Sequence, residues 1–242
     1  MGYGFKIIVE GDYACYTRPE LKVERVSYDV PTPGALEGML KSIYWKPAIR
    51  YCIDRIIIFN PIDFINIRRN EVKDKILFSA VKSQMNGKGG DPCIYTAESR
   101  SQRAAMVLKN VRYGIEFHFE LTGICDDKAD EGPNKHYNII KRRLDNGQYF
   151  RVPCLGCSEF PVKKILLVEE LDEREIAPEI ACQEDVDLGY MSYRVVFRDG
   201  GVPQNGDWEN PHFSDQATTV YYRPHMQRGI IDVAKYREGL QC

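Results

Sequence analysis

Apolar and polar residues alternate strictly along residues 111–121, in the clearest pattern of the chain. A period of two predicts a β-strand with one buried side and one side in water. The apolar side chains that share the predicted buried side are Val111, Tyr113, Ile115, Phe117, Phe119 and Leu121. Shorter apolar, partly β-branched runs predict further strands at residues 5–10, 53–59, 64–67, 76–81 and 163–168.

A first helix is predicted to begin near Pro33, after a favourable N-cap at Thr32. Apolar side chains then recur at positions i, i+3, i+4 and i+7, which is the stripe of an amphipathic helix: Leu36, Met39, Leu40 and Ile43. Pro47 ends the pattern. Tyr44 lies beside the apolar stripe and not within it, so its hydroxyl is expected at the edge of the helix.

A second helix is predicted over residues 134–146, with Asn134 as the expected N-cap and Asn146-Gly147 as the stop. Its apolar stripe consists of Tyr137, Ile140 and Leu144. Lys135 and His136 fall in the first turn, where the partial positive charge of the helix end disfavours cations. The same position suits an anion such as phosphate, and it leaves the histidine able to exchange a proton near neutral pH.

The predicted order of elements is strand, helix, strand, a β-rich insertion, strand, helix, strand. This order indicates an α+β protein: a ferredoxin-like (RRM-like) split βαβ domain with an inserted β-hairpin over residues 1–170. From residue 171 the composition becomes acidic and short aromatic strand-like runs appear, such as residues 190–197. Residues 171–242 are therefore predicted to form a smaller β-rich region.

The composition excludes some classes of protein. The 242 residues carry 33 Lys and Arg against 35 Asp and Glu, so the chain as a whole is not a strongly basic nucleic-acid binder. No apolar run approaches the roughly 20 residues of a membrane span, and no signal peptide is recognisable, so a cytoplasmic protein without a membrane partner is expected. The 8 cysteines are then expected to be free thiols, several of them buried.

Most other polar motifs favour a structural role. His118 lies between Glu116 and Glu120 on the polar side of its strand, as a satisfied structural histidine would. Cys154-Leu-Gly-Cys157 has no second pair of ligands, so a zinc site is not predicted. P-loop and nucleophile-elbow motifs are absent, and the acidic residues at 126–131 lack the spacing of a calcium loop. A metal-independent mechanism, with no cofactor, is therefore expected for any phosphoryl chemistry.

Several motifs together resemble the d-type Cas five family of the RAMP superfamily. They are Gly11-Asp-Tyr-Ala14, Ser42-Ile-Tyr-Trp-Lys-Pro47, Arg100-Ser-Gln-Arg103, Leu108-Lys-Asn-Val-Arg-Tyr113, Lys135-His-Tyr137 and Leu155-Gly-Cys-Ser-Glu159. Asn134 stands where the family commonly has glycine, and Asn110 where it commonly has aspartate. The resemblance is close over residues 5–165 and looser beyond them.

The resemblance implies an endoribonuclease that cuts the repeat of precursor CRISPR RNA without metal and stays bound to the 5′ handle. It also implies partners, namely the other subunits of a type I-C Cascade complex. The family's catalytic residues fall here on Tyr44, Lys135 and His136. Which of Tyr44 and His136 acts as acid or base is left open. An alternative function is a non-catalytic subunit that caps the guide RNA, and a weaker one is a general RNA-binding domain.

Cationic residues near these motifs are expected to contact the RNA. They are Lys46, Arg100, Arg103, Lys141, Arg142 and Arg143. Successive residues of a helix point about 100° apart, so at most two of Lys141, Arg142 and Arg143 are expected to face the RNA backbone.

Overall fold

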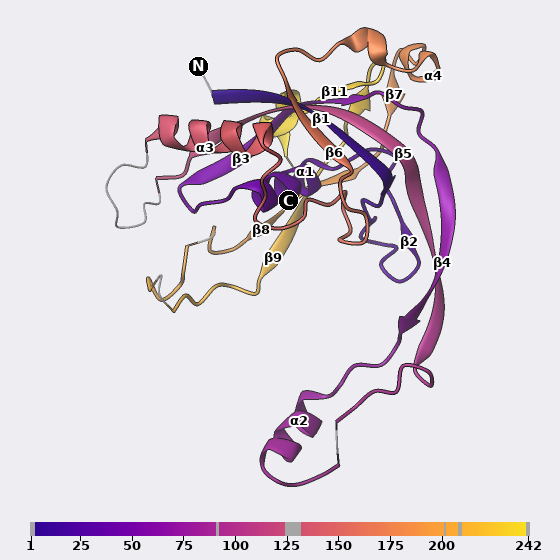
Figure 1. Cartoon of the computed structure of the whole chain (residues 1–242), viewed down its shortest axis with the longest axis vertical. Helices are drawn as coiled ribbons and strands as arrows, with labels where there is room; N and C mark the ends of the chain where they lie inside the picture. The colour runs from indigo at the N-terminus through magenta and orange to yellow at the C-terminus, as the bar shows by residue number, and fades with distance from the viewer. Residues whose placement is uncertain (1–2, 91, 124–131, 201, 208–209, 241–242) are drawn as a thin grey trace.

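The computed structural model describes residues 3–90, 92–123, 132–200, 202–207 and 210–240 (Figure 1). It is a mixed α/β structure built on one mostly antiparallel sheet, whose strand order is β11-β3-β5-β1-β6. The bounds of these strands are Ile230–Asp232, Ile49–Ile58, Arg100–Leu121, Tyr3–Ala14 and Lys164–Val168. Two more strands, β2 (Arg25–Val26) and β4 (Phe64–Val72), pair with β5, and only the β2 pairing is parallel.

The alternation predicted along residues 111–121 is confirmed in the second half of β5. Tyr113, Ile115, Phe117 and Phe119 are buried in the main hydrophobic core, whereas Leu121 at the end of the strand is exposed. The central position of β5, between β3 and β1, explains why its apolar side is the most regular of the chain. Every second residue has to pack against the helices that cover this side.

Two helices pack against the core. Helix α1 (Pro33–Ile43) follows β2 and buries the predicted stripe, and the Thr32 side chain accepts a hydrogen bond from the amide of Ala35 as its N-cap. Helix α3 (Pro133–Asp145) follows β5, and its N-cap is Gly132, so the prediction of Asn134 as N-cap is wrong. Pro133 takes the first helical position because its missing N–H costs nothing there. Gly147 has a φ of 62°, as the predicted stop requires.

The inserted segment forms a long arm (Figure 1). Strand β4 pairs along Arg100–Leu108 of β5, and helix α2 (Phe78–Met85) lies at the tip of this hairpin. The prediction of a strand over residues 76–81 is therefore wrong, since residues 76 and 77 lie outside any strand and α2 begins at Phe78. An apolar run of this length fits a short helix as well as a strand, and α2 buries none of its residues, so packing does not impose a sheet partner.

The C-terminal region extends the core. Strands β8 (Met191–Phe197) and β9 (Ala217–Tyr222) form a two-stranded sheet against α1, and β7 (Val186–Asp187) pairs with β10 (His225–Met226). Strand β11 joins the edge of the main sheet beside β3. The C-terminal region also contains short helical turns at Glu173–Glu175, Pro178–Ala181 (α4) and Ala234–Gly239. The domain boundary near residue 170 stays a prediction.

Among the residues that the structure describes, none of the helices has the length and apolar character needed to cross a bilayer.

Strand β5 changes its conformation at Asn110, between the arm and the core. Asn110 has a φ of 49°, and the pairing of β5 with β1 skips it, passing from Tyr13↔Lys109 to Gly11↔Val111. The Asn60 side-chain amide donates to the Asn110 carbonyl at 2.7 Å, which holds this conformation. Asparagine and aspartate adopt the left-handed region more easily than other side chains.

We expect Asn110→Ala to lower the free energy of unfolding by about 1 kcal/mol, since alanine is strained in the left-handed region. Asn110→Gly should leave it within ~0.5 kcal/mol of wild type, because glycine has no such strain. Urea unfolding of the two variants measures the difference. Equal losses of stability in both would contradict this account of Asn110.

Candidate active site

The C-terminal end of α1 meets the N-terminal turns of α3. Tyr44 is the C-cap residue of α1, and its hydroxyl lies 2.9 Å from Nδ1 of His136, a residue 92 positions further along the chain. Both side chains are in the interior, with exposed fractions of 6% for Tyr44 and 0% for His136. The two predicted catalytic side chains that can transfer a proton are thus in direct contact.

The backbone and ring of Tyr44 are held from two sides. The Tyr51 hydroxyl, on β3, donates to the Tyr44 carbonyl at 2.8 Å, and burial raises the pKa of Tyr51 well above its usual value, so this donor stays protonated. On α3, Arg143 donates to the Ile43 carbonyl at 2.5 Å, and its guanidinium lies 5.3 Å from the centre of the Tyr44 ring. These contacts fix the direction in which the Tyr44 hydroxyl points.

His136 belongs to the buried side of α3. Together with Ile140 and Leu144 it forms the buried stripe of the helix, whereas Tyr137, predicted in that stripe, is only half-buried. The edge of the Phe119 ring packs against the imidazole, with 6.2 Å between the ring centres. The aromatic neighbours limit rotation of the imidazole, which keeps Nδ1 toward Tyr44.

Lys135 precedes His136 and its side chain is exposed. Of the three residues predicted to be catalytic, Tyr44 and His136 are in contact in the interior, and Lys135, the residue before His136 on α3, is exposed at the surface. Such an arrangement can exchange protons and can stabilise negative charge on a phosphate.

The residues predicted to contact RNA occupy different parts of the fold. Lys141 and Arg142 are exposed on α3, and Lys46 is half-buried in the segment after α1. Arg100 and Arg103 are instead on the arm, where Arg103 is in an ion pair with Glu71 of β4 at 3.4 Å.

The Arg143 side chain points toward Tyr44, and no pattern in the sequence predicts this contact. Lys141 and Arg142 are exposed, whereas Arg143 is turned inward and is not solvated as a third, unused cation would be. Contact of Lys141 and Arg142 with RNA stays a prediction.

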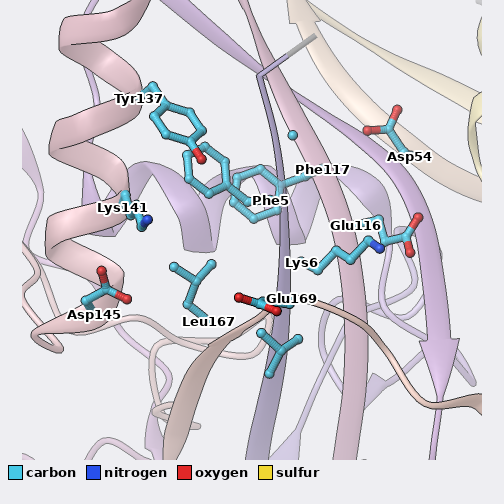
Figure 2. A pocket seen from close by; sticks show the side chains of 12 residues that line it. Phe5, Lys6, Asp54, Glu116, Phe117, Tyr137, Lys141, Asp145, Leu167 and Glu169 are labelled. Atoms are coloured by element: carbon cyan, nitrogen blue, oxygen red, sulfur yellow. The ribbon is translucent and has the colours of Figure 1, made fainter. Parts of the chain in front are cut away.

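A cavity of about 710 Å³ lies beside α3 (Figure 2). The rings of Phe5, Phe117 and Tyr137 stack along its inner wall, with 4.8 Å between the centres of Phe5 and Tyr137. Its charged lining comprises Lys6, Lys141, Asp54, Glu116, Asp145 and Glu169. Carboxylates outnumber ammonium groups in this lining, so the cavity does not favour the phosphates of a nucleic acid.

His118 has structural contacts, but its nearest carboxylate is Asp54 of β3, whereas Glu120, which flanks it in sequence, lies 3.8 Å from Nε2. Its Nδ1 lies 2.7 Å from Oδ2 of Asp54, and the other oxygen of this carboxylate, Oδ1, accepts from Arg237 at 2.5 Å. Among the described residues, Cys52, His118 and Glu120 are the one group whose ligand atoms lie close enough together to hold a metal ion. Burial raises the pKa of the Cys52 thiol to about 11, which opposes metal binding. Period-two alternation puts His118 on the side of β5 opposite Phe119 and His136.

The Cys154-x-x-Cys157 motif is not a pair in the structure. Cys157 instead lies near Cys15, and each sulfur is 3.5 Å from the Thr17 hydroxyl. A hydrogen bond from Cys15 lowers the pKa of Cys157, and Thr17 lowers it further. The six cysteines that the structure describes are free thiols, two of them buried, as predicted. Cys15 and Cys157 are 142 residues apart in the sequence, and no local motif predicts their contact.

Comparison with known proteins places these observations in a family. A model described as "CRISPR-associated protein (Cas_Cas5)", of the Cas5d type, matches residues 5–234. The protein therefore belongs to the Cas5d family of CRISPR-associated proteins, as the sequence motifs predicted.

Two relatives named "CRISPR pre-crRNA endoribonuclease Cas5d" are each 39% identical to this chain. The relative from Mannheimia succiniciproducens aligns over 98% of this chain and 97% of its own length. The relative from Thermus thermophilus aligns over 96% of this chain and 93% of its own length.

Solved structures share the fold at low sequence identity. An uncharacterized protein from Streptococcus mutans, SMU1763c, gives a TM-score of 0.62 at 21% identity, covering 99% of this chain and 97% of that one. A structure titled "Crystal Structure of CRISPR-associated Protein" gives a TM-score of 0.56 at 22% identity, covering 95% of this chain and 90% of that one. The mixed α/β fold with its mostly antiparallel sheet is thus a known one.

The inward position of Arg143 leads to a prediction. Arg143→Ala should lower the free energy of unfolding by about 2 kcal/mol, since it removes a charged donor from the Ile43 carbonyl and a cation from the Tyr44 ring. Arg142→Ala is the matched control on the next position of α3 and should change stability by less than ~0.5 kcal/mol. Thermal and urea unfolding compare them. Equal effects would show that the Arg143 contacts do not stabilise the site.

Proposed function

We propose that this protein is a metal-independent endoribonuclease that cleaves the repeat of precursor CRISPR RNA and remains bound to the 5′ handle of the product. The observation that carries the proposal is the contact between Tyr44 and His136, which joins two helix ends distant in sequence beside the exposed cation of Lys135. The names of the two relatives supply the substrate class.

The reaction that these side chains suit is transesterification by the ribose 2′-OH. The 2′-OH gives its proton to a base, O2′ bonds to phosphorus, and the bond from phosphorus to O5′ breaks as O5′ takes a proton from an acid. The products are a 2′,3′-cyclic phosphate and a 5′-OH, and water is not consumed. Tyr44 and His136 form one proton-transfer pair for these steps, and Lys135 stabilises the charge that develops on the phosphate oxygens.

Metal independence is supported by the chemistry of the side chains themselves. A catalytic divalent cation in a phosphoryl-transfer site is held by carboxylates, and none of Tyr44, Lys135 and His136 is one. The group Cys52, His118 and Glu120 belongs to the other side of the sheet.

The proposal includes the setting of the reaction. The protein acts in the cytoplasm as a subunit of a type I-C Cascade complex, beside the backbone and large subunits. The element order β1-α1-β3-β5-α3-β6 with strand order β3-β5-β1-β6 supports a ferredoxin-like core for it. The arm is then an insertion between the second and third strands of that core.

One observation favours the alternative function, a non-catalytic subunit that caps the guide RNA. His136 is fully buried, and a buried polar pair that satisfies its own hydrogen bond can serve the core alone. Catalysis requires the RNA to reach the Tyr44 hydroxyl, so the two functions differ in whether this pair contacts the substrate.

The first test is cleavage of the cognate repeat RNA in EDTA. A single cut with a 2′,3′-cyclic phosphate end is expected, and a 2′-deoxy nucleotide at the cut site should abolish it because the nucleophile is missing. Product ends are read by phosphatase and kinase treatment before electrophoresis. Cleavage that needs Mg²⁺, or that survives the deoxy substitution, would disprove the mechanism.

The second test separates chemistry from binding. Tyr44→Phe removes only the hydroxyl, and His136→Asn keeps a polar side chain, so both variants should fold. Each should lose about 10²-fold or more in single-turnover rate, as is typical when an acid or base is removed, with nearly unchanged affinity for the RNA. His118→Gln is the histidine control and should cleave at the wild-type rate. Full activity in both site variants would favour the capping function.

A further inference from the structure

A groove of about 770 Å³ runs along α1. Its walls are residues of α1 and of the segment 150–158, and it starts at Trp45, the residue after Tyr44. Two aromatic rings line it and face outward, with exposed fractions of 54% for Trp45 and 88% for Phe150. Exposed apolar side chains that gather in one groove, unlike ones that lie singly on a surface, mark an interaction site.

The position of Phe150 is fixed by the backbone. The amides of Phe150 and Arg151 both donate to the Ser42 carbonyl, at 2.9 and 3.1 Å. Ser42 is in the last turn of α1, whose carbonyls have no partners within the helix. Two backbone hydrogen bonds therefore hold the exposed ring against the helix end that also carries Tyr44 and Trp45.

The charge of the groove has one sign. Lys41 and Arg151 line it and are exposed, and none of the described residues that line it carries a carboxylate. This distinguishes it from the cavity beside α3, where carboxylates outnumber ammonium groups. A surface with aromatic rings and only positive charges is complementary to a strand that has both bases and phosphates.

A glycine in the middle of α1 keeps the groove open. Gly38 lines it, and a Cβ atom built there would meet nothing within 4 Å, so packing does not demand glycine. Glycine costs a helix interior roughly 1 kcal/mol relative to alanine. By contrast, a Cβ on Gly34 would lie 2.8 Å from the Tyr193 carbonyl, so that glycine is needed for packing. The space over Gly38 is therefore available to a ligand that approaches the backbone.

From these observations we infer that the groove binds single-stranded RNA, with bases stacked on Trp45 and Phe150 and phosphates beside Lys41 and Arg151. This subsite rests on the proposed function, since its ligand is the RNA segment next to the nucleotide at Tyr44. The subsite holds a single RNA strand beside Tyr44 and His136, and it does not require a base-paired duplex. Stacking tolerates any base, so the subsite positions the strand and does not select sequence.

The test measures RNA binding and requires no cleavage. A fluorescein-labelled single-stranded repeat RNA is titrated into wild type, Trp45→Ala and Phe150→Ala, and anisotropy gives the affinity. Each variant should bind about 10-fold or more weakly, which is within the range for loss of one stacked base. Phe213→Ala removes an exposed aromatic ring that does not line the groove, and it should bind as wild type does.

Two further variants separate stacking from other causes. Trp45→Phe should keep most of the affinity, whereas Trp45→Leu should lose as much as Trp45→Ala, because only an aromatic face can stack on a base. Gly38→Leu fills the groove while it improves helix propensity, so it should weaken RNA binding and leave the melting temperature at or above that of wild type. In a Trp208→Phe background, RNA should quench the fluorescence of Trp45.

The outcomes distinguish this inference from the proposed function. Wild-type affinity in both alanine variants, or equal affinity of the Phe and Leu variants at position 45, would overturn the RNA subsite and assign the groove to a protein partner. In that case wild type would still bind and cleave the repeat. Failure of wild type itself to bind repeat RNA would overturn the proposed function and the subsite together.

Discussion

The hydrogen bond between Tyr44 and His136 is the constraint on which the site depends, because it requires two helix ends from distant parts of the chain to meet. Helix α1 must end at residue 43 and α3 must begin at residue 133 for the two side chains to face each other. The sheet provides this geometry, since β3 and β5 continue from or lead into these ends and carry Tyr51 and Phe119 against the pair. A shift of one residue in either helix would turn its side chain by about 100° and break the contact.

Much of the fold could be predicted because its signals are local. The alternation along β5, the stripe of α1 and the glycine stop after α3 each follow from periodicity or backbone freedom over a few residues. Pro133 also predicts the start of α3, because proline favours the first position of a helix. This rule places the N-cap at Gly132, where the structure has it. The prediction of a strand at 76–81 was wrong because α2 buries none of its residues, so packing did not determine the structure of this short apolar run.

The candidate site could be predicted only in part. Family motifs gave Tyr44, Lys135 and His136, but their contact depends on packing between elements 92 residues apart, which has no local pattern. The inward turn of Arg143 is a case of the same kind: its sequence neighbours Lys141 and Arg142 look alike, and only the nearby Ile43 carbonyl and Tyr44 ring make it different. The groove beside Trp45 needed the structure as well, since Trp45 and Phe150 are far apart in sequence.

Because Tyr44 and His136 are buried, part of the free energy of RNA binding is needed to reach them. A hydrogen bond in the interior contributes roughly 1 kcal/mol, and a buried polar atom that loses its partner costs about 1–3 kcal/mol. In the proposed reaction the 2′-OH reaches the Tyr44 hydroxyl, and the RNA then has to replace part of this contact, so binding elsewhere must offset the cost. In our proposal this binding comes from the exposed cations Lys141 and Arg142 on α3 and from the groove along α1. Truncating the RNA so that these contacts are lost should therefore slow the chemical step itself, since remote binding energy is used to reach the reactive geometry.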